Sequence, residues 1–188
     1  MGRVTLPVDA KAGPTKPEVR SVLLGKLGLS RSDHFVDVGS CTGAVTIEAA
    51  RAAGRVTAVE RKEQRLEATR DNLAANPTGA DVELRRTEAP EGLPDDADVM
   101  FLGGSRNFED VLDHAVATGV DRVVMNVSRL EVAGEAVDAF RERDLLSEVV
   151  QFQVSHGYQL AGATSFDSQN PVYMLVGGTG AAADGGSG

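Results

Sequence analysis

The most constraining feature of the sequence is a regular alternation of short apolar runs with amphipathic stretches. Runs of β type occur at 35–38, 56–59, 82–84, 99–102, 123–127, 149–154 and 172–176. Stretches with the apolar spacing of helices fill 44–53, 62–75, 108–117 and 130–144, and another opens at 15–18. Such β-α repetition predicts an α/β fold whose parallel sheet carries helices on both faces.

The connection before the last apolar run breaks this alternation. Its 17 residues, HGYQLAGATSFDSQNPV, have no helical period. Because a parallel crossover normally needs a helix, the last strand is predicted to run antiparallel to its neighbour. A seven-stranded sheet with a reversed final strand resembles the Rossmann-like sheet of the class I S-adenosylmethionine (SAM) methyltransferases.

A glycine turn follows the first β-type run, in the stretch VDVGSCTGAV. Only one of the three glycines of a dinucleotide fingerprint is present, and no Gly-Lys-Ser/Thr triphosphate motif follows. The methyltransferase pattern, acid-x-Gly-x-Gly-x-Gly or a variant ending in Thr-Gly, fits better because Asp37 supplies the acid. The residues predicted to contact SAM here are Gly39, Ser40, Cys41, Thr42 and Gly43.

Glu60 ends the second β-type run, 21 residues beyond Gly39. An acid at that point can accept both ribose hydroxyls of a bound adenosine. The alternative is a helix acid that the macrodipole favours. Because the turn and the acid occur together, the ribose role is the stronger interpretation.

The composition limits the class of protein further. Net charge is −9, from 28 acidic and 19 basic residues, and only Lys11, Lys16, Lys26 and Lys62 are lysines. Acidic, lysine-poor surfaces suit concentrated salt, and they disfavour a nonspecific grip on nucleic acid. No apolar stretch is long enough for a membrane helix and no signal peptide is visible, so we expect a cytoplasmic protein.

Several blocks of the sequence resemble the decarboxylating precorrin methyltransferases of cobalamin biosynthesis (the CbiT type). They are GPTKPEVR, VDVGSCTGAVTIEAA, TAVER, TEAPEGLP, FLGGS, VVMNVSRLE and QNPVYMLVG, and they span residues 13 to about 177. The resemblance implies SAM-dependent methylation of carbon 15 of cobalt-precorrin-6B, with loss of the carbon 12 acetate carboxyl. It also implies a homotetramer.

The resemblance also assigns residues to the cofactor site. It implies that Thr15, the glycine turn, Glu60 and Ala89 contact SAM, with Glu88 beside the adenine. Three positions depart from the family pattern: Cys41 replaces a glycine, Glu88 an aspartate, and His156 a common arginine. Thr15 could alternatively act only as a helix cap, because Thr-x-x-Glu is also a capping box.

Residues just beyond the later strands are predicted to hold the tetrapyrrole. Carboxyl ends of parallel strands meet at one edge of the sheet, where ligands bind. The candidates are Gly104, Ser105, Arg106, Asn126, Arg129 and His156. Cations in this set would attract an acidic substrate, although each could be an ordinary surface charge, Asn126 a cap, and the glycines a plain turn.

Other kinds of site have little support in the sequence. The three histidines lack metal-ligand spacing, and Cys41 has no evident activating base, so we expect neither a metal site nor a cysteine nucleophile. No general base is assigned.

Residues 1–176 are expected to form one domain and 177–188 a disordered tail. A tRNA adenine methyltransferase and a non-catalytic SAM-binding module remain alternatives, to be separated by an assay with labelled SAM.

Overall fold

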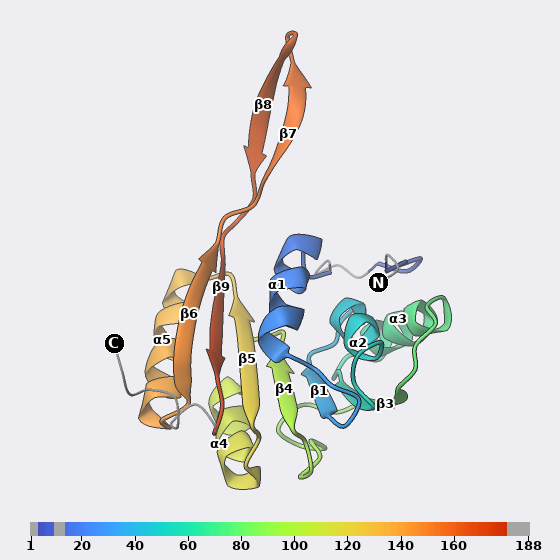
Figure 1. Cartoon of the computed structure of the whole chain (residues 1–188), viewed down its shortest axis with the longest axis vertical. Helices are drawn as coiled ribbons and strands as arrows, with labels where there is room; N and C mark the ends of the chain where they lie inside the picture. The colour runs from blue at the N-terminus through green and yellow to red at the C-terminus, as the bar shows by residue number, and fades with distance from the viewer. Residues whose placement is uncertain (1–3, 10–13, 180–188) are drawn as a thin grey trace.

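The computed structural model describes residues 4–9 and 14–179. Its main sheet has seven strands in the order β3-β2-β1-β4-β5-β9-β6 (Figure 1). The strands are β1 His34–Val38, β2 Arg55–Val59, β3 Asp81–Arg85, β4 Val99–Leu102, β5 Arg122–Val127, β6 Leu146–Phe152 and β9 Val172–Gly177. The order reverses between β1 and β4, and in open α/β sheets this switch point is where ligands bind.

The reversed last strand is confirmed. β9 lies between β5 and β6 and runs antiparallel to both, while the other neighbouring strands in the sheet are parallel. The seven predicted strands agree with these seven to within a few residues. The predicted fold class is therefore correct.

The connection before β9 contains two strands that the sequence analysis did not predict. β7 Ser155–Leu160 and β8 Ala163–Ser168 pair with each other as a separate antiparallel hairpin. This hairpin projects well beyond the end of the main sheet (Figure 1). Ala161 and Gly162 join its strands with φ values of 50° and 81°, as a two-residue type I′ turn requires.

In the described part of the chain, five helices cover the two faces of the sheet. They are α1 Pro17–Leu27, α2 Ala44–Ala49, α3 Glu63–Ala74, α4 Phe108–Thr118 and α5 Leu130–Glu142. On one face, α1 and α2 pack on a core that includes Leu23, Phe35 and Phe101. On the other face, α4 and α5 pack on a core that includes Leu112 and Phe140.

The start of α1 differs from the prediction. The helix begins at Pro17 with Lys16 as its N-cap, and no side chain of the described residues makes a capping hydrogen bond. The capping box predicted from Thr15 and Glu18 is therefore wrong, because a proline at the first position already suits a helix start.

The C-terminal boundary also shifts. Gly177 is the last residue of β9, and the Gly178 N–H donates to the Leu145 carbonyl at 3.0 Å. Thr179 binds the Val120 carbonyl through both its N–H and its hydroxyl. Residues 177–179 thus pack against the domain, and the rest of the predicted tail, 180–188, lies outside the described residues.

Candidate active site

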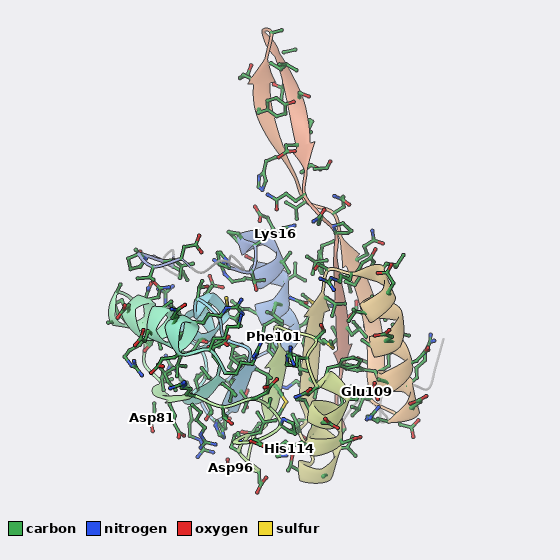
Figure 2. All side chains as sticks on the ribbon, turned by 180° about the vertical axis from the view of Figure 1, so that it is seen from behind. Lys16, Asp81, Asp96, Phe101, Glu109 and His114 are labelled. Carbon is green, nitrogen blue, oxygen red and sulfur yellow. The ribbon has the colours of Figure 1, made fainter. Side chains whose placement is uncertain are left out.

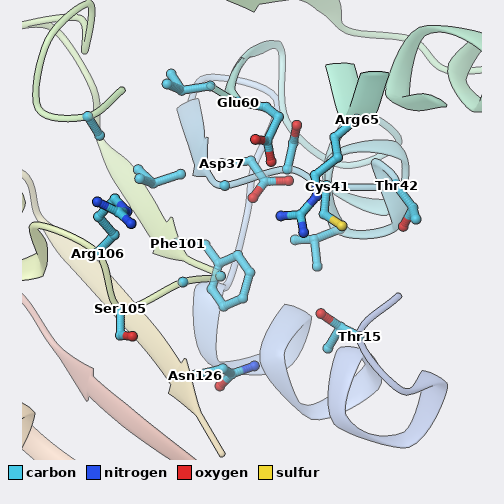
Figure 3. Close-up of a pocket in the computed structure, with 18 of the residues that line it drawn as sticks. Thr15, Asp37, Cys41, Thr42, Glu60, Arg65, Phe101, Ser105, Arg106 and Asn126 are labelled. Atoms are coloured by element: carbon cyan, nitrogen blue, oxygen red, sulfur yellow. The ribbon is translucent and has the colours of Figure 1, made fainter. Parts of the chain in front are cut away.

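A cavity of about 980 Å³ opens at the carboxyl ends of β1, β2, β4 and β5 (Figure 3). It is as large as the upper range of small-molecule sites. All of the predicted site residues except Gly43 and His156 line it. The glycine turn and the end of β2 form one half of the cavity. The ends of β4 and β5 form the other half.

The glycine turn, residues 39–43, is built by left-handed backbone. The φ values are 85° at Gly39, 54° at Cys41 and 76° at Gly43. A Cβ on Gly43 would lie 2.8 Å from Cγ2 of Thr69 in α3. Gly43 is thus required for helix packing next to the cavity and is not among its lining residues.

Asp37 lies at the base of the turn and is 1% exposed. The Thr46 hydroxyl donates to its Oδ2 at 2.5 Å, while its buried Oδ1 has no partner among the described residues. Burial raises the pKa of Asp37 to about 6, and the nearby Glu60 adds to the rise. A buried carboxylate oxygen without a donor, in the wall of a cavity, fits a cationic ligand such as SAM.

Glu60 is 5% exposed at the end of β2. The Lys62 N–H donates to its Oε1 at 2.9 Å, which orients the carboxylate. α3 begins only at Glu63, so Glu60 does not lie in the first turn of that helix. The geometry therefore favours the ribose interpretation over that of a helix-dipole acid.

The second half of the cavity surrounds the end of β4. A Cβ on Gly103 would lie 3.2 Å from the Gly39 carbonyl, so a glycine lets the two turns approach closely. At Gly104 a Cβ would meet nothing within 4 Å, which leaves open space for a ligand. Ser105 lines the cavity beside it.

Asn126, in β5, faces the same space (Figure 3). Its side-chain oxygen and nitrogen are both buried and have no partner in the described structure. It lies within the strand, paired with Met174, and α5 starts from the N-cap Arg129. Asn126 is not the N-cap of that helix, and its amide offers both a donor and an acceptor to a ligand.

The cavity is more basic than the chain as a whole. Its lining includes five basic side chains, Lys16, Arg61, Arg65, Arg106 and Arg129, and three acidic ones, Asp37, Glu60 and Glu88. Lys16, Arg61 and Arg65 were not among the site residues predicted from the sequence. The position of Arg61 directly after Glu60 is a signal that could have identified it.

Arg106 and Glu88 connect the two halves. Nε of Arg106 lies 3.3 Å from Oε1 of Glu88, and both side chains are well exposed. Glu88, predicted to lie beside the adenine, thus pairs with a residue predicted to bind substrate. Ala89 lines the cavity next to Glu88.

The structure does not favour chemistry at Cys41. Burial raises the pKa of its thiol, and the opposing effect of Arg65 is smaller. The thiol therefore stays protonated at neutral pH, and a thiol is a poor nucleophile compared with a thiolate. The described residues contain no group of side chains that could hold a metal ion, nor a helix with the length and apolar character to cross a membrane.

His156 and Thr15 have different surroundings from those predicted. His156 lies on β7, away from the cavity lining, with Nε2 3.8 Å from Oε1 of Glu18. It was expected at the edge of the main sheet, but the chain turns into the hairpin there. Thr15 does line the cavity, and its carbonyl accepts a hydrogen bond from Arg20. Its side chain does not cap α1.

The sheet order, the turn after β1 and the acid at the end of β2 define a class I methyltransferase, with SAM as methyl donor. The family described as "Precorrin methyltransferase domain" matches residues 10–177. The chain belongs to this family.

Individual relatives agree with this assignment. A protein named "Probable cobalt-precorrin-6B C(15)-methyltransferase (decarboxylating)" from Halobacterium salinarum is 73% identical over 94% of this chain and 95% of its own. The crystal structure of a precorrin-6y C5,15-methyltransferase from Geobacter metallireducens is 34% identical, covers 91% of this chain and 94% of its own, and superposes with a TM-score of 0.82. The crystal structure of a precorrin 8W decarboxylase from Methanobacterium thermoautotrophicum is 28% identical and covers 91% of this chain and 96% of its own. It superposes with a TM-score of 0.84.

Proposed function

We propose that the protein methylates carbon 15 of cobalt-precorrin-6B and removes the carboxyl of its carbon 12 acetate, giving cobalt-precorrin-7. One observation carries this proposal. A single cavity joins a half that suits SAM to a half lined by Arg106, Arg129 and Asn126, whose amide has no partner among the described residues. The relatives' names supply the reaction. The alternatives, a tRNA adenine methyltransferase and a non-catalytic module, have no comparable support.

The charges of the cavity fit an acidic tetrapyrrole. The whole chain carries −9, which repels a substrate with many carboxylates. Five basic against three acidic side chains in the lining reverse the sign locally. An arginine guanidinium can bind a carboxylate through two parallel hydrogen bonds.

The residues of the cavity would orient the reactants. SAM supplies an electrophilic methyl group. Glu60 would accept the ribose hydroxyls, and Asp37 would place negative charge beside the cationic end of the cofactor. Arg129 and Asn126 would hold the macrocycle so that carbon 15 faces the methyl group at about 3 to 3.5 Å, the separation of a near-attack arrangement.

The decarboxylation needs little from the protein beyond orientation. When the carbon–carboxylate bond breaks, its electron pair can pass into the conjugated macrocycle as carbon dioxide leaves. The macrocycle thus acts as the electron sink, and the proton that the carbon 12 methylene takes up to become a methyl group balances the one that the methylated macrocycle releases. We accordingly assign no general acid or base among the residues of the cavity.

The test is an assay with SAM labelled in its methyl group. The protein is mixed with cobalt-precorrin-6B in one arm and with unmodified tRNA in another. We expect label in the tetrapyrrole together with release of carbon dioxide, and none in the RNA. Label in tRNA would favour the RNA methyltransferase, and SAM binding without transfer in either arm would favour a binding module.

We also propose that the protein forms a homotetramer through the β7–β8 hairpin. A two-stranded sheet is marginally stable alone, and within residues 4–9 and 14–179 no other strand pairs with either outer edge of this one. Tyr158 and Leu160 are 45% and 55% exposed on one face, and Phe166 is 67% exposed on the other. Figure 2 shows hairpin side chains standing clear of the main body. Copies of the same hairpin would cover both the edges and these faces.

Sedimentation in concentrated salt tests this assembly. We expect a tetramer for the wild type and a monomer for Phe166→Asp. Val116→Asp is the control, because Val116 is also apolar and 43% exposed but lies on α4. A monomeric wild type, or a Phe166→Asp variant of unchanged mass, would contradict the proposal.

We infer that the protein works in the cytoplasm at high salt. The acidic surplus and the scarcity of lysine support this inference. So does its relative from Halobacterium salinarum, a halophile. Screening by salt reduces the self-repulsion of such a surface. A free energy of unfolding that rises between low and molar KCl is the expected result.

A further inference from the structure

The N-terminal segment 4–9, which we call the strap, is held against α3 by two asparagines. Asn76 accepts a bond from the Thr5 N–H at 3.0 Å and donates one to the Thr5 carbonyl at 2.6 Å. Asn72 likewise accepts a bond from the Val8 N–H at 2.9 Å and donates one to the Val8 carbonyl at 2.8 Å. Both asparagines are buried. The strap is therefore attached by two matching pairs of hydrogen bonds.

The two asparagines differ in their other bonds, and Oδ1 of Asn76 also accepts a hydrogen bond from Nη2 of Arg51 at 3.1 Å. Nδ2 of Asn72 also donates to the Thr42 carbonyl at 2.8 Å, inside the glycine turn. Nδ2 of Asn76 instead donates to the Asn72 carbonyl at 2.7 Å, at the end of the helix. Of the two side chains, Asn72 is the one that joins the strap to the turn.

A second side chain of α3 holds the neighbouring carbonyl of the turn. The Thr69 hydroxyl donates to the Cys41 carbonyl at 3.0 Å. Cys41 has a φ of 54°. Residues other than glycine adopt this left-handed backbone conformation only at a cost in free energy. With a cysteine in place of glycine, the turn depends on outside contacts to keep its shape. Asn72 and Thr69 supply such contacts at successive carbonyls.

We propose that Asn72 is a positioning residue that couples the strap to the cofactor turn. When Val8 fixes both ends of the Asn72 amide, Nδ2 is aimed at the Thr42 carbonyl and holds the turn in its binding shape. SAM affinity then depends on a segment that is not part of the cavity lining. This inference rests on the proposed SAM-binding role of the turn, and not on the identity of the methyl acceptor.

The test compares Asn72→Ala with Asn76→Ala in the full chain, with SAM binding measured by calorimetry and stability by thermal unfolding. Each variant loses one pair of strap bonds, and Asn76→Ala also loses the bond from Arg51, so we expect Tm to fall in both. Only Asn72→Ala should weaken SAM binding, by about fivefold or more, because only it frees the Thr42 carbonyl. A third variant, Asn72→Asp, keeps an acceptor for the Val8 N–H but loses the donor, and should also bind SAM weakly.

A second pair of variants covers the case in which buried Asn72 does not tolerate alanine. Val8→Pro removes the N–H that Asn72 accepts, and Thr5→Pro removes the N–H that Asn76 accepts. We expect weaker SAM binding for Val8→Pro alone. Equal affinities within either folded pair would overturn the coupling. Glu60→Gln separates this result from the SAM site itself: if that variant also binds SAM normally, the site is misplaced.

Discussion

Thr46 donates a hydrogen bond of 2.5 Å to Oδ2 of Asp37, from the third residue of α2 to the buried end of β1. The other carboxylate oxygen, Oδ1, is buried in the wall of the cavity and has no partner in the part of the chain that the structure describes. One oxygen thus anchors the acid to the helix, and the other is left for a ligand. Burial raises the pKa of Asp37 to about 6.

This pKa predicts that SAM binding weakens as the pH falls. Above about 6, Asp37 is ionised and attracts the cationic cofactor, whereas below it the carboxyl takes up a proton and the attraction is lost. The dissociation constant should rise several-fold between pH 7 and pH 5, and up to tenfold for each unit below the pKa. Calorimetry across this range measures the effect.

Asp37→Asn is the control for this pH dependence. It keeps an acceptor for Thr46 but carries no charge at any pH. Its SAM affinity should be lower than that of the wild type at pH 7 and nearly flat down to pH 5. A wild-type slope that persists in Asp37→Asn would assign the titration to another group.

Glu60→Gln should weaken SAM binding and leave the fold intact. A glutamine can still accept the Lys62 N–H at Oε1 but presents a neutral amide to the ribose. Charge-assisted bonds to two hydroxyls are each worth about 1.5 to 3 kcal/mol, so the loss should be at least tenfold. Calorimetry with SAM, alongside an unchanged circular dichroism spectrum, checks it. A wild-type dissociation constant would remove Glu60 from the site.

The strands and most of the cavity could be predicted from sequence because periodicity and glycine turns are local signals. The carboxyl edge gathers residues from successive strands, which is why Ser105 and Asn126 were expected beside the cofactor turn. His156 was misplaced because nothing in its own stretch distinguishes an exposed hairpin from a loop. Arg65 was missed because its entry into the cavity depends on how α3 packs, which is tertiary information.

Asn126→Leu should make the protein more stable and less active. The two buried amide atoms lack partners in the described structure, and each such group costs about 1 to 3 kcal/mol. Leucine has a similar size and no polar atoms, so the free energy of unfolding should rise while kcat/KM falls. Urea unfolding and a turnover assay measure the two effects. Loss of stability together with activity would indicate a purely structural amide.

Substitutions of Cys41 test how closely the turn approaches the cofactor. Its φ of 54° suits glycine, so Cys41→Gly should fold and bind SAM within about twofold of the wild type. Cys41 lines the cavity, and Cys41→Phe should fill part of it and abolish detectable binding. Calorimetry on both variants decides the matter. Equal binding by wild type and Cys41→Phe would show that the turn does not face the cofactor.

Arg129 is expected to contribute more to substrate binding than Arg106. Arg106 is already paired with Glu88, with 3.3 Å between Nε and Oε1, and must leave this partner to bind a substrate carboxylate. The structure gives Arg129 no ion pair among the described residues, so its charge is available at the mouth of the cavity. Arg129→Ala should raise the tetrapyrrole KM about fivefold to tenfold, and Arg106→Ala by a smaller factor, with SAM affinity unchanged in both.

Arg141→Ala is the matched control for Arg129→Ala, because both variants lower the net charge by one. Arg141 lies in the last turn of α5, 3.9 Å from Asp138, and does not line the cavity. If the general field of the protein governs substrate binding, the two variants should raise KM equally. If local cations govern it, only Arg129→Ala should do so, and its KM should respond less to added KCl than that of the wild type. Equal KM values for Arg129→Ala and wild type would mean that the tetrapyrrole is anchored elsewhere.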